Sequence, residues 1–272
     1  MIHNIINMFS YTFMIRAIVV GVLVSLCSAL LGVSLVLKRY SMIGDGLSHV
    51  GFGALAIATA LGLSPLKVTV PVVVIAAILL LRLSENNKLK GDSAIGIISV
   101  TAMALGVLSV SVSTGLNTDL YGFLFGSILA MSSDDVSLSI LLSLAVIALY
   151  AVFYNRIFAV TFDEDFAKSG GTSATLYNML IAVLTAVTIV LGMRMMGSLI
   201  ISALIIFPAV TSMRLCKSYK GVVLCSAILS VVCFFIGVVI SFLYDLPTGA
   251  SIVVVNAAAL LIFMTIEKIK KN

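Results

Sequence analysis

Charged residues are scarce in this sequence, and tryptophan is absent. Only 10% of the 272 residues are Asp, Glu, Lys or Arg, whereas soluble domains carry roughly 25%. Such a small charged fraction cannot cover the surface of a water-soluble protein of this length, and 61% of the residues are hydrophobic. The chain is therefore expected to lie in a lipid bilayer.

Cysteine and histidine are also few, which excludes several classes of protein. The sequence contains no Cys-x-x-Cys pair, and its cysteines lie in or beside apolar runs, where they are expected to pack as small apolar residues (Cys27, Cys216, Cys225 and Cys233). Two histidines, His3 and His49, are too few for a multi-histidine metal site within one chain. We find no HExxH, GxSxG or nucleotide-binding motif, no basic face for nucleic acid and no cleavable signal peptide.

Long apolar runs dominate the remainder of the sequence. A membrane-spanning helix needs about 20 apolar residues. Nine runs approach or exceed this length: 13–37, 43–63, 68–82, 93–113, 136–153, 176–193, 197–213, 221–243 and 248–266. A shorter apolar stretch at 120–131 suits a re-entrant or interfacial helix better. The sequence thus predicts an all-α, polytopic transmembrane bundle of about eight to nine spans, forming one domain over residues 1–272.

The connections between these runs differ in positive charge. The odd-numbered connections and the C-terminal tail hold thirteen Lys and Arg residues, whereas the even-numbered ones hold only Lys67 and Arg194. Positively charged connections stay in the cytoplasm. This bias places the odd connections and the C-terminus inside and, with nine spans, the N-terminus outside. The even segment 114–135 instead carries Asp119, Asp134 and Asp135, which either attract cations or are ordinary solvated acids.

One pair of polar residues lies near the start of the second run. Asp45 and His49 are four residues apart and share one face of a helix. Ionisable groups in a span usually face a bundle interior or a cavity. A carboxylate with an imidazole suits Zn²⁺, Mn²⁺ or a proton relay, although the two groups could also simply hydrogen-bond to each other. Nearby glycines permit either a narrow pathway or close helix packing (Gly44, Gly46, Gly51 and Gly53).

The longest polar segment, 154–175, falls on the predicted cytoplasmic side. It combines a short amphipathic stretch with Gly170 and Gly171, where a helix is expected to stop. The segment is either a partner-binding element or an ordinary solvated connection.

Four segments resemble the ABC-3 family, the permease subunits of bacterial zinc/manganese ABC importers. They are KRYSMIGDGLSHVGFGALAIA (38–58), DLYGFLFGSILAMSSDD (119–135), FDEDFAKSGG (162–171) and GSLIISALIIFPAVTSMRL (197–215). The resemblance implies an ABC importer permease fold in the bacterial inner membrane. It also implies a second permease subunit forming a dimer, two cytoplasmic ATP-binding subunits and an extracytoplasmic metal-binding protein. The permease itself would not be an enzyme.

The same resemblance assigns roles to individual residues. Asp45 and His49 become metal ligands in the translocation pathway, and a dimer would supply two of each. Within a coupling segment at about 156–175, the residues implied to face the ATPase are Asp163, Glu164, Asp165, Ala167, Gly170 and Gly171. No cofactor is implied to be bound permanently, only transported Zn²⁺ or Mn²⁺. His49 is followed by Val-Gly-Phe-Gly, which looks more like the zinc type. The alternative is a secondary or proton-coupled metal-ion transporter that uses Asp45 and His49.

Overall fold

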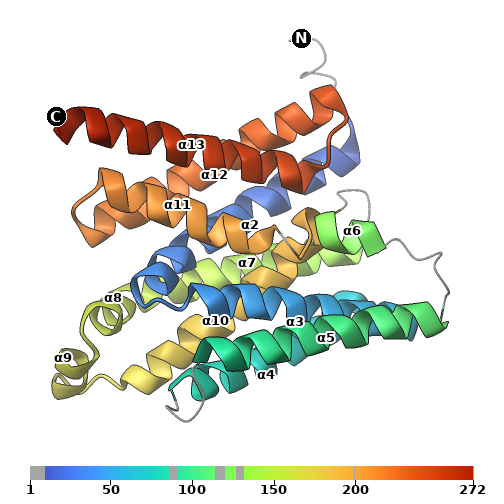
Figure 1. Ribbon diagram of the computed structural model, residues 1–272, viewed down its shortest axis with the longest axis horizontal. Coiled ribbons are helices and arrows are strands. Elements are labelled where there is room, and N and C mark those ends of the chain that lie inside the picture. Colours follow the sequence, from blue (N-terminus) through green and yellow to red (C-terminus); the bar gives the residue numbers. More distant parts are fainter. Residues whose placement is uncertain (1–9, 86–90, 114–119, 127–131, 199, 272) are drawn as a thin grey trace.

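The computed structural model describes residues 10–85, 91–113, 120–126, 132–198 and 200–271, and all regular elements in these ranges are helices (Figure 1). The expected all-α fold is confirmed. The described ranges contain nine helices of 15 to 26 residues: α2 (Thr12–Leu37), α3 (Ser41–Ala60), α4 (Pro65–Glu85), α5 (Gly91–Ser113), α7 (Ser133–Val152), α10 (Ala174–Met196), α11 (Ile201–Leu215), α12 (Tyr219–Tyr244) and α13 (Thr248–Lys271). Shorter helices are α6 (Leu120–Phe125), α8 (Tyr154–Phe162) and α9 (Glu164–Ser169).

The nine long helices correspond one to one with the predicted runs. Seven of them, in the described part of the chain, are long and apolar enough to cross a membrane. The other two are α3, which has 20 residues but is interrupted by polar side chains and glycines, and α11, which has only 15. At 1.5 Å per residue, α11 is about 22 Å long, shorter than the hydrocarbon core. The predicted count of eight to nine spans is approximately confirmed.

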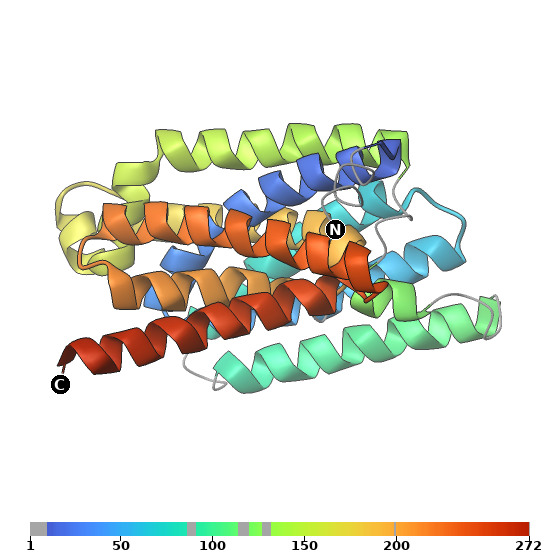
Figure 2. The ribbon, with the colours of Figure 1, turned by 90° about the horizontal axis from the view of Figure 1, so that it is seen from above.

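The long helices run back and forth along one common direction (Figures 1 and 2). Helices α5 and α13 lie on one face of the bundle and α7 on the opposite face (Figure 2). One end, here called the α8–α9 end, contains the α2–α3 corner, α8, α9, the α11–α12 connection and the last turns of α13. The opposite end, called the α6 end, contains α6 and the first residues of α2 and α13.

Helix α3 packs closely against its neighbours because glycine replaces larger side chains at the contacts. A Cβ atom on Gly53 would clash with the backbone oxygen of Ala102 in α5, and one on Gly106 would approach the Cα of Gly53 at 2.7 Å. A Cβ on Gly51 would meet Met193 of α10 at 2.8 Å, whereas one on Gly44 would meet nothing within 4 Å. Close packing therefore explains most of these glycines, as small residues do in other membrane helices.

The connection from α10 to α11 differs from the sequence prediction. The run 197–213 was expected to be a span, but α10 continues to Met196 and α11 begins only at Ile201. Gly197, at φ +88°, ends α10, and a side chain there would clash with the backbone of Leu124 in α6. The apolar runs placed this break a few residues early, at 194–196, because Ser198 and Ile200 are buried like helix residues. Irregular backbone is tolerated at membrane depth when protein surrounds it.

We expect Gly53→Ala to lower the stability of the protein by about 1–3 kcal/mol, because the added methyl group overpacks the α3–α5 contact. Gly44→Ala is the matched control, since its methyl group enters open space and alanine favours a helix by up to about 1 kcal/mol. Thermal unfolding in detergent would compare the two. A Gly53→Ala protein that melts at or above the parent temperature would contradict the packing argument.

Candidate metal site and coupling segment

Asp45 and His49 lie on α3, four and eight residues after its first residue, Ser41. The Nε2 atom of His49 is 3.7 Å from Oδ2 of Asp45, which is too long for a hydrogen bond. Two ligands on one tetrahedral Zn²⁺ lie about 3.4 Å apart when the metal–ligand bonds are about 2.1 Å. The separation is thus compatible with two neighbouring ligands of one ion and too long for a hydrogen-bonded pair.

Both side chains retain free coordinating atoms. The Nδ1 atom of His49 is buried and has no hydrogen-bond partner among the described residues. The Asp45 side chain remains 42% exposed, so its carboxylate can be reached from outside this chain. The described residues contain no group of three or more His, Cys, Asp or Glu side chains that could hold a metal. One chain thus offers an incomplete ligand set, two donors where zinc usually takes four.

The predicted coupling segment forms α8 and α9. Asp163 lies between them and caps α9: its Oδ1 accepts hydrogen bonds from the backbone N–H groups of Asp165 at 3.1 Å and Phe166 at 2.9 Å. The helix stops where the glycines predicted, with Gly170 as its C-cap and Gly171 at φ +78°. These residues therefore shape the segment.

The remaining members of the predicted coupling set point in opposite directions. The Asp165 side chain is 94% exposed, whereas Ala167 is buried in a small cluster with Val160 and Ala174. Glu164 turns inward, and its Oε1 accepts hydrogen bonds from Lys38 and from Asn178 of α10. Burial alone raises the pKa of a carboxylic acid, but these hydrogen bonds outweigh burial and hold the pKa of Glu164 below its usual value.

Two features of this end were missed in the sequence. Phe166 is 72% exposed beside Asp165, an unusual position for a large aromatic side chain. No role was predicted for the Phe166 ring, although an aromatic residue inside an acidic stretch could have indicated an exposed contact residue. The partnership of Lys38 with Glu164 spans 126 residues and has no local signature.

The acidic segment near the α6 end is less available to cations than its composition suggested. Asp135 forms an ion pair with Arg194 at 2.9 Å and also completes a capping box with Ser132 at the start of α7. Asp134 is exposed, and Asp119 lies outside the described residues. The Asp135 carboxylate thus serves to join α7 to the last turn of α10.

Comparison with known proteins agrees with this arrangement of helices. The model of the ABC 3 transport family matches residues 10–267. The chain belongs to the ABC 3 transport family. The resemblance seen in the four sequence segments is therefore confirmed, and it extends over nearly the whole chain.

Relatives in this family carry names that refer to two metals. The chain is 30% identical to the high-affinity zinc uptake system membrane protein ZnuB of Haemophilus influenzae, over 89% of this chain and 92% of that protein. It is 28% identical to the manganese import system permease protein ScaB of Streptococcus gordonii, over 93% and 90%. Among solved structures, PsaBC from Streptococcus pneumoniae in complex with Fab matches with a TM-score of 0.87 and 29% identity, covering 97% of this chain and 95% of that chain.

We expect Asp163→Ala to loosen the start of α9, because it removes the acceptor of two capping hydrogen bonds. Loss of a cap costs about 1 kcal/mol, which corresponds to roughly fivefold more frequent opening of the first turn of α9. Hydrogen–deuterium exchange of the Asp165 and Phe166 amides would measure it. Asp163→Asn is the matched control, since asparagine caps helices as well as aspartate. Equal exchange in both variants would show that the cap does not hold α9.

Proposed function

We propose that this chain is the membrane-spanning permease subunit of an ATP-driven importer for a divalent metal ion, with Zn²⁺ as the first candidate and Mn²⁺ as the second. The observation that carries the proposal is the Asp45–His49 pair, at ligand separation on a closely packed helix of an ABC 3 family chain. Relatives are named for both ions, and manganese names are the more frequent. Zinc is placed first because Val-Gly-Phe-Gly follows His49.

A second copy of the chain completes the proposed site. The exposed Asp45 carboxylate is costly if it faces lipid, because charged groups inside a membrane require a partner or water. A two-fold partner that covers this face would add its own Asp and His, giving four donors.

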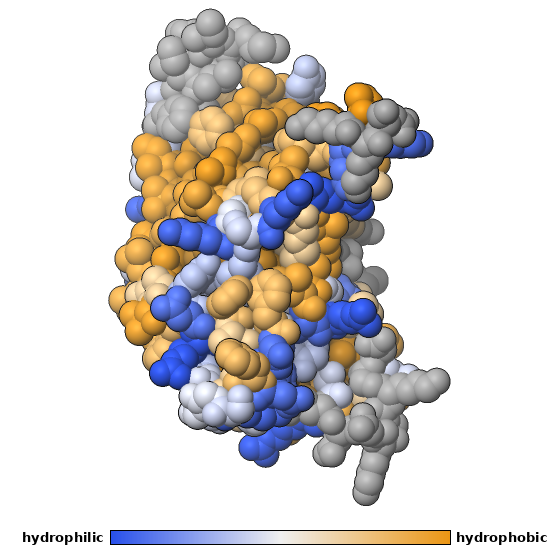
Figure 3. All heavy atoms as spheres, turned by 90° about the vertical axis from the view of Figure 1, so that its left-hand side faces the viewer, coloured by the Kyte–Doolittle hydropathy of each residue, from blue (hydrophilic) through white to orange (hydrophobic). Residues whose placement is uncertain are grey.

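The α8–α9 end is the proposed cytoplasmic face, where two ATP-binding subunits dock. Most of the basic connections of the chain lie at this end, including Arg39, Arg156 and Arg214, and this agrees with the charge rule. Figure 3 looks onto this end and shows hydrophilic residues spread among apolar ones. The exposed Asp165 and Phe166 supply the contact. An extracytoplasmic binding protein delivers the ion at the α6 end.

Transport then proceeds by alternating access. Asp45 and His49 hold the ion briefly, and ATP binding and hydrolysis in the partner subunits shift the helices between outward-facing and inward-facing states. The site must bind weakly enough to release its ion. A proton-coupled carrier would use the same two residues without an ATPase, so dependence of uptake on an ATP-binding subunit separates the two functions.

Asp45→Ala and His49→Ala should each abolish Zn²⁺ and Mn²⁺ uptake, because each removes one of the two donors of the chain. Uptake of each ion by metal-limited cells expressing the complete transporter is the measurement, with co-purification of the ATP-binding subunit as the test of assembly. Leu141→Ala is the control, since this side chain is 66% exposed on α7, on the opposite face of the bundle from α5. Normal uptake of both ions by either alanine variant would refute the assignment.

Phe166→Ala should weaken co-purification of the ATP-binding subunit about tenfold or more without unfolding the permease, because the exposed ring contacts little of its own chain. Ile269→Ala is the control: this side chain is 75% exposed and lies near the C-terminus at the same end. Unchanged recovery of the ATPase with Phe166→Ala would remove the ring from the proposed contact.

A further inference from the structure

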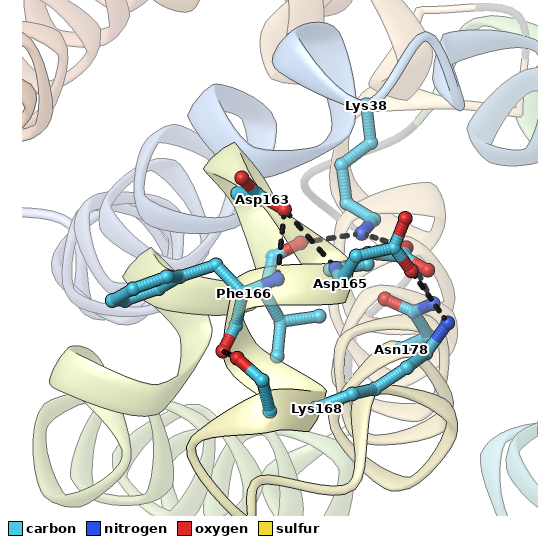
Figure 4. A network of polar contacts seen from close by, with 9 residues as sticks. Lys38, Asp163, Asp165, Phe166, Lys168 and Asn178 are labelled. Carbon is cyan, nitrogen blue, oxygen red and sulfur yellow. Dashed lines mark hydrogen bonds and ion pairs between the residues drawn. The ribbon is translucent and has the colours of Figure 1, made fainter.

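Lys38 is the most deeply buried charged side chain at the α8–α9 end among those whose ion pairs the structure describes. Its side chain is only 5% exposed, and its Nζ atom donates to the backbone oxygen of Val160 at 2.9 Å and to Oε1 of Glu164 at 2.6 Å. Asn178 donates to the same Oε1 at 3.0 Å. Figure 4 shows Lys38 and Asn178 converging on α9 from two different helices. The cluster therefore joins the end of α2 to α8, α9 and α10.

A buried lysine is retained at a cost, since a charge removed from water is rarely stabilising even when it is paired. An apolar pair of similar size would fill the same space with less penalty. The ion pair thus fixes the position and direction of the Lys38 and Glu164 side chains, which an apolar contact would not do.

Lys38 is connected to the metal residues by a short and stiff stretch of chain. It is the C-cap of α2, Arg39 adopts a left-handed conformation at φ 59°, and the N–H of Tyr40 closes the corner by donating to the Leu35 oxygen at 2.8 Å. Helix α3 begins at the next residue, and Asp45 follows about 6 Å along it. A displacement of Lys38 must therefore displace the start of α3.

Helix α9 presents different residues to its two sides. Asp165 and Phe166 point away from the protein, whereas Glu164 points toward Lys38. A partner that pushes on the outward side moves the inward side with it, because α9 is a single short helix capped at both ends.

We propose that the Lys38–Glu164 ion pair is the positioning link that transmits movement of the α8–α9 segment to the α2–α3 corner, and through it to Asp45 and His49. This inference rests on the proposed transport function. It assigns Glu164 to coupling within the permease rather than to contact with the ATPase, unlike Asp165.

The test uses the complete transporter in liposomes, with Zn²⁺ or Mn²⁺ as the transported probe. The central variant is the double substitution Lys38→Met/Glu164→Gln, which removes both charges, keeps their approximate size and leaves no uncompensated buried charge. We expect normal assembly and ATP hydrolysis within twofold of the parent, but at least tenfold less metal transported per ATP hydrolysed. A pair that only stabilised the fold would lower assembly and leave this ratio unchanged.

The matched control is Arg214→Met/Glu267→Gln. That ion pair has a similar length, 2.9 Å, and joins α11 to α13 at the same end. Its metal-to-ATP ratio should equal that of the parent.

Two results would overturn the link: a ratio within twofold of the parent in the Lys38→Met/Glu164→Gln transporter, or loss of assembly with an unchanged ratio in the complexes that remain. If the unmodified transporter moves neither Zn²⁺ nor Mn²⁺ with ATP, the proposed function itself fails, which is a different outcome.

Discussion

Gly53 of α3 and Gly106 of α5 let two helix backbones touch, and the position of the candidate metal site depends on this contact. Apolar side chains gain little by associating inside a lipid bilayer, so helix packing there relies on close van der Waals contact. Glycines on different sides of α3 allow that contact, Gly53 with α5 and Gly51 with α10. The helix is thereby held near the middle of the bundle, while the carboxylate of Asp45, nearer its start, remains accessible from outside the chain.

The charged side chains of the bundle fall into two groups. Asp135 with Arg194, and Glu164 with Lys38, are paired at 2.9 Å and 2.6 Å, and each pair joins helices that are distant in sequence. Asp45 and His49 are 3.7 Å apart, and no ion pair in the described part of the chain joins either of them to another helix. A low-dielectric interior makes an unsatisfied polar group expensive. The contrast distinguishes ion pairs that join distant helices from the Asp45–His49 pair, which we propose binds the transported ion.

Local pattern was sufficient to predict much of this arrangement. Apolar runs predicted the long helices, the i, i+4 spacing placed Asp45 and His49 on one face, and Gly170 and Gly171 predicted the end of α9. The break between α10 and α11 was predicted a few residues early, because Ser198 and Ile200 are as buried as a helix interior. The direction of Glu164 was missed because its partner, Lys38, is 126 residues away and no spacing rule connects them.

The role of Lys38 also changes how the charge asymmetry is understood. The lysine was counted among the residues that orient the chain, yet it is nearly inaccessible to water. Arg194, which belongs to the even-numbered connections, is likewise held in an ion pair, and its side chain is only 10% exposed. Setting both aside leaves the excess of positive charge at the odd connections intact, so the proposed orientation does not depend on either residue. Lys38, at the α2–α3 corner, can then serve as the proposed connection to α9. Its neighbour Arg39 is exposed and still contributes to the orientation of the chain.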